Sequence, residues 1–290
     1  AQRTPTNRLL AIYLLVSATA LLFSHRPAAW PALLALHLLG AAAALGLGPL
    51  GRLGRALNQR FPSAFRIVAD WYPIILVPAL YTELATLNLS VWNGSYFDAH
   101  IQRLDQALFG EQPSTELSRH WPSLTLSEVL HASYLSYYFI IYAPPLILYA
   151  RQRRAEFRAM VFAVMLSFFV HYLFFIYFPV QGPRYLFPAP DGEISRGKVF
   201  GLTHKILEAG SSRGAAFPSS HLGVSLTQTL ITFQFLPRLA IVLALLTFGL
   251  ALGAVYGGFH YATDMIAGLI LGVVVVLIAP SARRLLGGAR

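Results

Sequence analysis

Two histidines and one aspartate in the C-terminal third of the chain have the spacing of a catalytic unit. His260 and Asp264 are four residues apart, which on a helix places both side chains on one face within hydrogen-bonding reach. A carboxylate bonded to one imidazole nitrogen fixes the tautomer and leaves the other nitrogen free as a nucleophile. His221 follows Pro218 at the predicted start of another helix, where unpaired N–H groups and the helix dipole favour an anion. The pattern predicts that His260 attacks an anionic substrate, with Asp264 supporting it and His221 acting as an acid.

Side chains that could bind a phosphate lie in the segment before His221. Arg184 and Arg213 carry planar forks of donors that match phosphate oxygens, and Lys198 lies between them in the sequence. Ser219 and Ser220 complete the predicted set of phosphate-binding residues. We therefore predict a phosphoryl-transfer site that uses no metal and no other cofactor.

The composition indicates that this site belongs to a membrane protein. Of the 290 residues, 56% are hydrophobic and only 12% are charged, and the mean hydropathy is +0.57. In a typical soluble protein, about a quarter of the residues are charged. The chain has no cysteine, which excludes disulfides, thiol nucleophiles, zinc–thiolate sites and iron–sulfur clusters.

Eight segments are long and apolar enough to be predicted as transmembrane helices. They lie near residues 9–24, 28–48, 70–90, 127–150, 158–178, 218–236, 239–257 and 261–281. We expect an all-α integral membrane fold, with an additional amphipathic helix at the membrane surface within residues 91–126. The chain is expected to divide into a two-helix N-terminal extension, residues 1–66, and a membrane core, residues 67–290.

The cations are distributed unequally when the eight spans alternate across a membrane. Fourteen of the 22 Lys and Arg residues fall on the side of the two termini and eight on the other, five of them within residues 179–217. The positive-inside rule then predicts cytoplasmic termini in the plasma (inner) membrane and an extracytoplasmic site. A solvated polar loop is the alternative interpretation of the basic segment. The net charge of +10 suits an anionic lipid substrate, whereas nucleic acid is disfavoured because no soluble basic module is present.

The motifs resemble those of the type 2 phosphatidic acid phosphatases, also called lipid phosphate phosphatases. The run Pro218-Ser219-Ser220-His221 resembles the second motif of that superfamily, His260 with Asp264 resembles the end of the third, and Arg184 corresponds to the first. The resemblance implies that six of the eight helices form a phosphatase-like core and that the reaction passes through a phosphohistidine. The short form of the motifs and the stretch from residue 97 to 113 are most similar to the inositol-phosphorylceramide synthase-like branch.

Two cations of the superfamily are missing from this chain. The position of a motif lysine corresponds to Tyr177, and that of a motif arginine corresponds to Ala254. The candidates to replace them are the cations of the basic segment: Arg196, Lys198, Lys205 and Arg213.

The sequence leaves the acceptor of the phosphoryl group open. Water as acceptor would make the protein a lipid phosphatase, which is the preferred interpretation, and an alcohol acceptor would make it a lipid headgroup phosphotransferase. A transporter of anionic lipids is a further alternative, although the chain shows no paired halves. A magnesium-dependent alcohol phosphatidyltransferase is disfavoured because no predicted span contains clustered aspartates. The expected partners are therefore a membrane lipid and, in the transferase alternative, an alcohol; the oligomeric state is not predicted.

Overall fold

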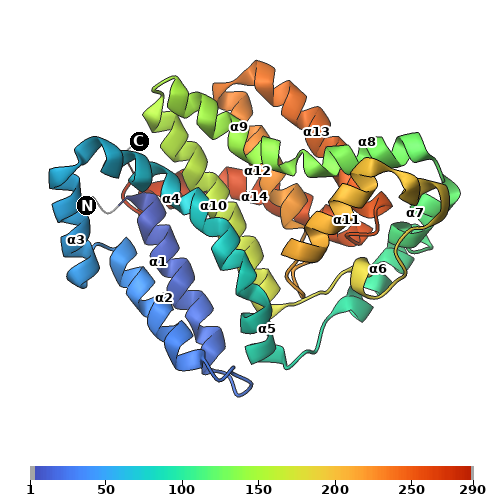
Figure 1. The fold of residues 1–290 in the computed structure, drawn as a ribbon, viewed down its shortest axis with the longest axis horizontal. Helices are drawn as coiled ribbons and strands as arrows, with labels where there is room; N and C mark the ends of the chain where they lie inside the picture. Colours follow the sequence, from blue (N-terminus) through green and yellow to red (C-terminus); the bar gives the residue numbers. More distant parts are fainter. Residues whose placement is uncertain (1–3, 289–290) are drawn as a thin grey trace.

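The computed structural model describes residues 4–288, and this part of the chain is helical, with no β-strand (Figure 1). Arg3 and Arg290, two of the fourteen cations on the side of the termini, lie outside the described residues. The α-helices in chain order are α1 (Pro5–Ala18), α2 (Trp30–Ala44), α3 (Gly48–Arg60), α4 (Pro62–Thr82), α5 (Leu84–Trp92), α6 (Asp98–Phe109), α7 (Pro113–His120), α8 (Leu124–Leu135), α9 (Tyr137–Ala150), α10 (Arg154–Tyr177), α11 (Lys198–Gly210), α12 (Ser220–Phe235), α13 (Pro237–Tyr256) and α14 (Ala262–Leu285).

Many of these helices begin where local chemistry favours a helix start. Ser219 and Ser123 precede α12 and α8, and each side chain accepts a hydrogen bond from a backbone N–H in the first turn. Pro62, Pro113 and Pro237 are the first residues of α4, α7 and α13, where proline loses no hydrogen bond. These starts follow from the sequence, whereas the packing of the helices does not.

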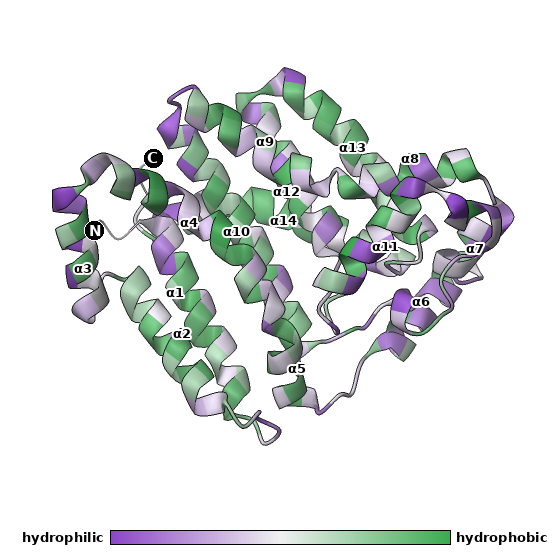
Figure 2. Cartoon of the chain, in the orientation of Figure 1, coloured by the Kyte–Doolittle hydropathy of each residue, from purple (hydrophilic) through white to green (hydrophobic). Residues whose placement is uncertain are grey.

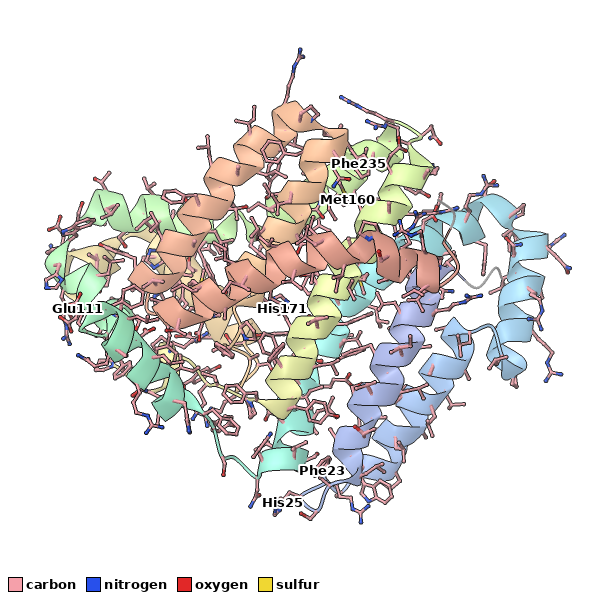
Figure 3. All side chains as sticks on the ribbon, turned by 180° about the vertical axis from the view of Figure 1, so that it is seen from behind. Phe23, His25, Glu111, Met160, His171 and Phe235 are labelled. Atoms are coloured by element: carbon pink, nitrogen blue, oxygen red, sulfur yellow. The ribbon has the colours of Figure 1, made fainter. Side chains whose placement is uncertain are left out.

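Helices α10, α12 and α14 form the centre of the molecule. Most residues of α10 are buried, and they join one large apolar cluster with residues of α1, α4, α5, α12 and α14. Figure 3 shows Met160 and His171 along α10, with Phe235 near the Met160 end and with Phe23 and His25 at the opposite edge of the molecule. Helix α10 therefore runs from the end of the helix bundle near Phe235 towards the end near Phe23 and His25.

Five helical stretches in the described residues are long and apolar enough to cross a membrane. They are Pro5–Leu22, Pro62–Thr82, Arg154–Tyr177, Pro237–Tyr256 and Ala262–Leu285, and Trp30–Ala44 is apolar but shorter. Figure 2 shows hydrophobic residues along α1, α2, α13 and α14, and hydrophilic residues gathered on α3, α6 and α7. The chain therefore has the helices of a membrane protein, but the predicted number of eight spans is not confirmed.

Two of the predicted spans are broken into separate helices. The segment near 70–90 consists of α4 and α5, which meet at Glu83, and the segment near 127–150 consists of α8 and α9, which meet at Ser136. The Ser136 hydroxyl donates to the carbonyl of Ser133 at 2.5 Å, a local bond that competes with a continuous helix. Hydropathy averaged over a window does not detect such breaks, because the residues on both sides are apolar.

The predicted span near 218–236 is a 16-residue helix with a polar interior side. Thr227 of α12 donates to Gly223 in its own helix and to Gly272 of α14, and Gln228 is fully buried. Cβ atoms added at Gly268 and Gly272 would lie 2.5 Å and 2.7 Å from backbone oxygens of residues 219 and 223. Small residues therefore let α14 approach α12 closely, and α12 is enclosed by protein along most of its length.

The segment expected to hold one amphipathic helix contains two, α6 and α7. Leu104, Leu108 and Phe109 are exposed on α6, whereas Asp98 and Asp105 are buried. The carboxylates thus face the protein, and the apolar residues form the outer side. The proposed boundary between residues 66 and 67 falls within α4, and the division into an extension and a core stays a prediction.

Candidate active site

Three loops from distant parts of the chain meet at the end of α10, before α12 and before α14. The backbone of Val180 forms an isolated parallel bridge to Ala215. Its N–H donates to Gly214 at 3.2 Å and its carbonyl accepts from the N–H of Ala216 at 2.9 Å. The bridge joins the loop that carries Arg184 to the loop that leads to His221.

The third loop is held against the first two at Gly182. This glycine has φ of 93°, a conformation that side chains with a Cβ rarely adopt. An added Cβ would lie 3.0 Å from the Cβ of Ala216 and 3.3 Å from the carbonyl oxygen of Phe259. A glycine is therefore needed at residue 182, where the three loops come together. The contact in the third loop is Phe259, which directly precedes His260.

The predicted catalytic residues form a continuous chain of polar contacts. His260 Nδ1 lies 3.4 Å from Asp264 Oδ2, and His260 Nε2 lies 3.5 Å from His221 Nδ1. Asp264 also accepts the N–H of Tyr261 at 2.9 Å, and its carbonyl accepts the N–H of Ser219 at 3.0 Å. The carboxylate therefore orients one nitrogen of His260 and leaves the other facing the second histidine, which is the arrangement that a nucleophilic imidazole requires.

Burial sets the protonation state of the proposed nucleophile. His260 is 4% exposed, and this desolvation lowers its pKa to about 4, since a charged imidazolium is disfavoured away from water. The imidazole is thus neutral, with a lone pair available, across the neutral pH range. Helix α12 begins one residue before His221, so the positive end of its dipole lies beside the histidines.

Arg184 and Arg213 are brought together by one aromatic ring. The guanidinium carbon of each lies 5.1 Å from the centre of the Tyr185 ring. Arg184 also bonds to the hydroxyl of Ser211 through Nη1. Two of the predicted phosphate-binding cations therefore lie at the same tyrosine ring, although they are 29 positions apart in the sequence.

The broken helix α4–α5 positions the loop that carries Arg213. The Asn88 side chain donates to the carbonyl of Arg213 at 2.9 Å, and the Tyr81 hydroxyl accepts the N–H of Ser212 at 3.2 Å. The Ser212 hydroxyl in turn accepts the N–H of Ala85 at 3.1 Å. A continuous helix would leave no unpaired N–H at Ala85, so the break contributes directly to the placement of the arginine.

The other predicted phosphate-binding residues lie in different surroundings. Lys198 is exposed at the first residue of α11, whose N-terminal amides at Val199 and Phe200 donate to the Glu128 carboxylate. Ser219 is buried; its hydroxyl accepts the N–H of Leu222. Ser220 is buried as the first residue of α12. The structure therefore brings both serines to the histidines, and it leaves Lys198 at the surface.

The positions of the two missing superfamily cations have structural roles here. The Tyr177 hydroxyl donates to the carbonyl of Val16 at 2.9 Å, which ties the end of α10 to α1. Ala254 is fully buried, and its carbonyl accepts the N–H groups of Phe259 at 2.9 Å and of His260 at 3.1 Å. The turn that presents His260 thus depends on the backbone of Ala254.

Two carboxylates of α6, a helix that was expected only to lie at the membrane surface, hold the loops of the site. Asp98 accepts the N–H groups of Gln181 and Gly182, each at 2.9 Å. Asp105 accepts the N–H groups of Ala262 at 3.1 Å and Thr263 at 2.8 Å, and also the Thr263 hydroxyl at 2.5 Å. The second set caps the start of α14, next to Asp264. The seven-residue spacing of the two aspartates, which places them on one helix face, was the available sequence signal.

Tyr134 is a further residue of the site that the motifs did not assign. Its hydroxyl lies 3.2 Å from Nε2 of His221, on the side of the ring opposite to His260. Arg184 lies within electrostatic range of the same hydroxyl. Asp264, His260, His221 and Tyr134 therefore form one row of polar groups, which, with Arg184 and Arg213, we call the histidine site.

A cavity of about 740 Å³ opens beside Arg184. Its walls come from α7, from α11 and from the loops around residues 183–194 and 257–258, so it reaches within two residues of His260. Ser114, Ser118 and His204 supply polar atoms to the wall. Burial and the nearby charge of Arg184 lower the pKa of His204, to about 4. The cavity combines polar and apolar walls of a size that fits a lipid headgroup.

No group of three or more His, Asp or Glu side chains in residues 4–288 is arranged to hold a metal ion. Metal independence nevertheless stays a prediction, which requires an activity measurement in chelator.

Comparison with protein families identifies the part of the chain that contains this site. The model of a family described as the PAP2 superfamily matches residues 99–278, which include the paired arginines, His221, His260 and Asp264. Searches of curated proteins and of solved structures gave no match.

Proposed function

We propose that this chain, which belongs to the PAP2 superfamily, is a membrane lipid phosphatase that acts through a phosphohistidine. Membership supports phosphatase-type phosphoryl transfer, and the apolar helices support a membrane location. The observation that carries the proposal is the row from Asp264 through His260 to His221. Arg184 lies close to the Tyr134 hydroxyl that contacts His221, and Arg213 lies beside Arg184 at the Tyr185 ring. Together these groups supply a nucleophile, its orienting carboxylate, an acid and cations for the phosphate oxygens.

In the first proposed step, Nε2 of His260 attacks phosphorus. A P–N bond forms and the P–O bond to the lipid alcohol breaks. The anionic phosphate beside His221 favours the protonated form of this ring, and His221 gives that proton to the departing oxygen. Arg184 and Arg213 neutralise the negative charge of the non-bridging oxygens. Because the facing nitrogens of the two histidines are only 3.5 Å apart, the phosphoryl group has to separate the rings as it enters.

In the second step, a water molecule attacks the phosphohistidine and His221 removes its proton. The P–N bond breaks, which releases inorganic phosphate and restores neutral His260. Asp264 accepts a hydrogen bond from Nδ1 throughout, so it stabilises the positive charge that this ring carries in the intermediate.

The test is a lipid panel offered to purified protein in chelator. Phosphatidate, a polyprenyl pyrophosphate and phosphatidylinositol are incubated with the wild type and with His260→Ala, and the products are identified by mass spectrometry. Release of inorganic phosphate from a lipid by the wild type alone supports the proposal. Strict dependence on magnesium, or equal turnover by the variant, would overturn it.

A headgroup phosphotransferase is the second candidate, and the 740 Å³ cavity beside Arg184 favours it, since an alcohol acceptor needs room near the phosphohistidine. Addition of ceramide or diacylglycerol to the same assay separates the two functions. A new phosphodiester that forms only with the acceptor identifies a transferase. Movement of lipid across vesicles without any chemical change would instead identify a transporter.

The distribution of arginines supports the proposal that the histidine site faces the extracytoplasmic side of the plasma membrane. The absence of cysteine makes labelling of single introduced cysteines a direct test. Ala189→Cys lies in the loop beside the cavity, and Ala155→Cys lies at the start of α10; both positions are exposed. Intact cells treated with a membrane-impermeant maleimide should label only the first variant. Labelling of the second alone would reverse the orientation.

A further inference from the structure

A second cavity, of about 580 Å³, lies at the far end of the central helices from the histidine site. Its walls include Phe157 and Val161 near the start of α10 and Arg283 near the end of α14, whereas the histidine site lies at the other ends of both helices. Since α14 has 24 residues, and a helix rises about 1.5 Å per residue, the two places are separated by nearly the full thickness of a membrane.

Three arginines from three different helices line this second cavity. Arg8 comes from α1, Arg158 from α10 and Arg283 from α14, and we call the site the arginine cavity. Asp70 is the one carboxylate among the described residues that line the cavity, so three guanidinium groups against one carboxylate leave these side chains with a formal net charge of about +2. The start of α1 and the end of α14 meet beside α4 (Figure 1).

Asp70 has an oxygen that the described protein atoms do not satisfy. Its Oδ1 accepts a hydrogen bond from Nε of Arg158 at 2.9 Å, whereas Oδ2 is buried and has no hydrogen-bond partner in the described residues. The residue is 8% exposed, so bulk water does not readily solvate this oxygen. A buried acceptor without a donor is costly, so a ligand that donates a hydrogen bond to this oxygen would remove that cost.

The arginines also have capacity for a ligand. Arg158 uses Nε for Asp70, and its side chain is half exposed, so the two terminal nitrogens of its fork can reach an oxyanion. Arg8 uses Nη1 for the carbonyl of Leu286 at 3.0 Å, which holds its guanidinium at the end of α14. The cavity therefore offers an anion site next to an unsatisfied acceptor.

The depth of the arginine cavity matches that of lipid headgroups. It lies at the ends of three candidate membrane spans, at residues 5–8, 157–161 and 283, and beside residues 69–73 of a fourth. Phosphates of a bilayer lie at this level, just outside the hydrocarbon region. Basic pockets between membrane helices are suited to anionic headgroups at such a place.

We propose that the arginine cavity binds the headgroup of an anionic phospholipid that carries a free hydroxyl, with phosphatidylglycerol as the simplest example. Arg8 and Arg158 bind the phosphate, and Oδ2 of Asp70 accepts the hydrogen bond of the headgroup hydroxyl. Pro73, Phe157 and Val161 provide the apolar wall next to the glycerol and the first part of an acyl chain. The bound lipid joins α1 of the N-terminal extension to α10 and α14 of the core.

The test measures lipid binding and does not depend on catalysis. Full-length protein in detergent is titrated with phosphatidylglycerol and with phosphatidylcholine, and binding is followed by native mass spectrometry and by the thermal unfolding midpoint. Phosphatidylglycerol should raise the midpoint in a concentration-dependent way, and phosphatidylcholine should not. Arg8→Gln and Arg158→Gln should each weaken the Kd for phosphatidylglycerol by about tenfold or more, since each removes a charge-assisted bond.

Matched controls separate this site from the histidine site and from general surface charge. Arg238→Gln changes an exposed arginine at the first turn of α13, outside the arginine cavity, and should bind phosphatidylglycerol as the wild type does. His260→Ala should also keep the lipid-dependent shift in the unfolding midpoint. If His260→Ala abolishes the shift, the lipid binds at the histidine site and the proposal is overturned.

Two further comparisons test whether the bound molecule is a lipid and whether its net negative charge is recognised. Glycerol 3-phosphate or inorganic phosphate at millimolar concentration should leave the midpoint unchanged, because neither gains the contacts of the acyl region. An equal shift with either soluble compound would overturn the lipid assignment. Equal binding of phosphatidylethanolamine would overturn the recognition of net negative charge. Because Arg158→Gln leaves Asp70 unpaired and could unfold the protein, Arg8→Gln, whose partner is a carbonyl, keeps the proposal testable.

Discussion

The two carboxylates of α6 that hold the loops of the histidine site are satisfied more fully than Asp70 in the arginine cavity. Asp98 and Asp105 accept hydrogen bonds at both oxygens from groups of the loops that they hold. Asp70 pairs one oxygen with Arg158 and leaves the other without a partner in the described residues. Asp264, which contacts His260, also keeps one oxygen, Oδ1, without a partner in the described residues. The carboxylates of α6 are therefore satisfied by the chain itself, whereas Asp70 keeps an oxygen that a ligand can reach from the arginine cavity.

This difference teaches how buried charge can be used in a membrane protein. A buried carboxylate that is surrounded by backbone N–H groups fixes the position of those groups, so it acts on chemistry from a distance. A buried carboxylate with an open oxygen keeps an unmet demand for a donor. Substitutions in the two regions should therefore have different effects on turnover and on lipid binding.

His260→Ala should break the contrast most severely, because it removes the nucleophile. We expect kcat for phosphate release to fall by at least about 10⁴-fold, while the protein keeps its elution volume and its unfolding midpoint in detergent. Steady-state release of phosphate measures the effect. His120→Ala, an exposed histidine at the end of α7, serves as the matched control and should retain wild-type turnover. A variant with activity within tenfold of the wild type would exclude His260 as the nucleophile.

Asp105→Asn tests whether α6 positions the site. The amide nitrogen of asparagine cannot accept a hydrogen bond, so one N–H of residues 262–263 loses its partner and the start of α14 shifts. A displacement of about 1 Å near the reacting atoms costs about 100-fold in rate. We therefore expect kcat to fall by about that factor with a smaller change in KM.

Two controls belong to the Asp105 experiment. Glu111→Gln changes an exposed carboxylate after α6 and should have wild-type kinetics. Asp70→Asn, at the arginine cavity, should change lipid-dependent stability without a comparable loss of kcat. Equal losses of kcat in Asp70→Asn and Asp105→Asn would remove the distinction between the two regions.

The acid limb of the pH profile sharpens the account of His260. Its pKa of about 4 means that the neutral nucleophile persists as pH falls below the ordinary histidine value and is lost only near pH 4. At pH 5, a histidine with an ordinary pKa of about 6.5 would be about 3% neutral, so the expected rate is about 30-fold higher than in that case. Measurement of kcat/KM between pH 4 and 8 provides the comparison. An acid limb with its midpoint near 6.5 would contradict the effect of burial.

Tyr134→Phe should have the smallest effect of the four. Loss of its hydroxyl removes a 3.2 Å contact to His221 but leaves the nucleophile and its carboxylate in place, so we expect about a tenfold fall in kcat. Tyr138→Phe, at a half-exposed ring of α9, is the control. An unchanged kcat in Tyr134→Phe would assign the tyrosine to packing alone.

The helices that could be predicted from sequence are the ones whose composition is apolar without interruption. The expected spans near 158–178, 239–257 and 261–281 agree within a few residues with α10, α13 and α14. The breaks at Glu83 and Ser136 could not be predicted, because they depend on hydrogen bonds to distant segments and on local side-chain bonds. The same breaks place Asn88 and Tyr134 at the histidine site.

The histidines and their aspartate could be located from spacing, but their partners could not. Asp105 contacts residues more than 150 positions away, and a carboxylate on an amphipathic helix has no local feature that reveals such a role. The sequence also could not show which cation of the basic segment would lie beside Arg184. The arrangement around Tyr185 brings Arg213 beside Arg184, whereas Lys198 lies at the exposed start of α11.

Local sequence specifies the apolar helices, the four-residue spacing of His260 and Asp264, and the serine that caps the helix presenting His221. These features are local, and their causes are the helix period, the propensity for caps and the cost of burying polar backbone in lipid. The packing of the helices determines that Arg184 and Arg213 meet, that Asp98 and Asp105 hold the loops, and that one oxygen of Asp70 stays without a partner in the described residues. Those outcomes depend on contacts between segments far apart in the chain, and their geometry exists only after the helices have packed.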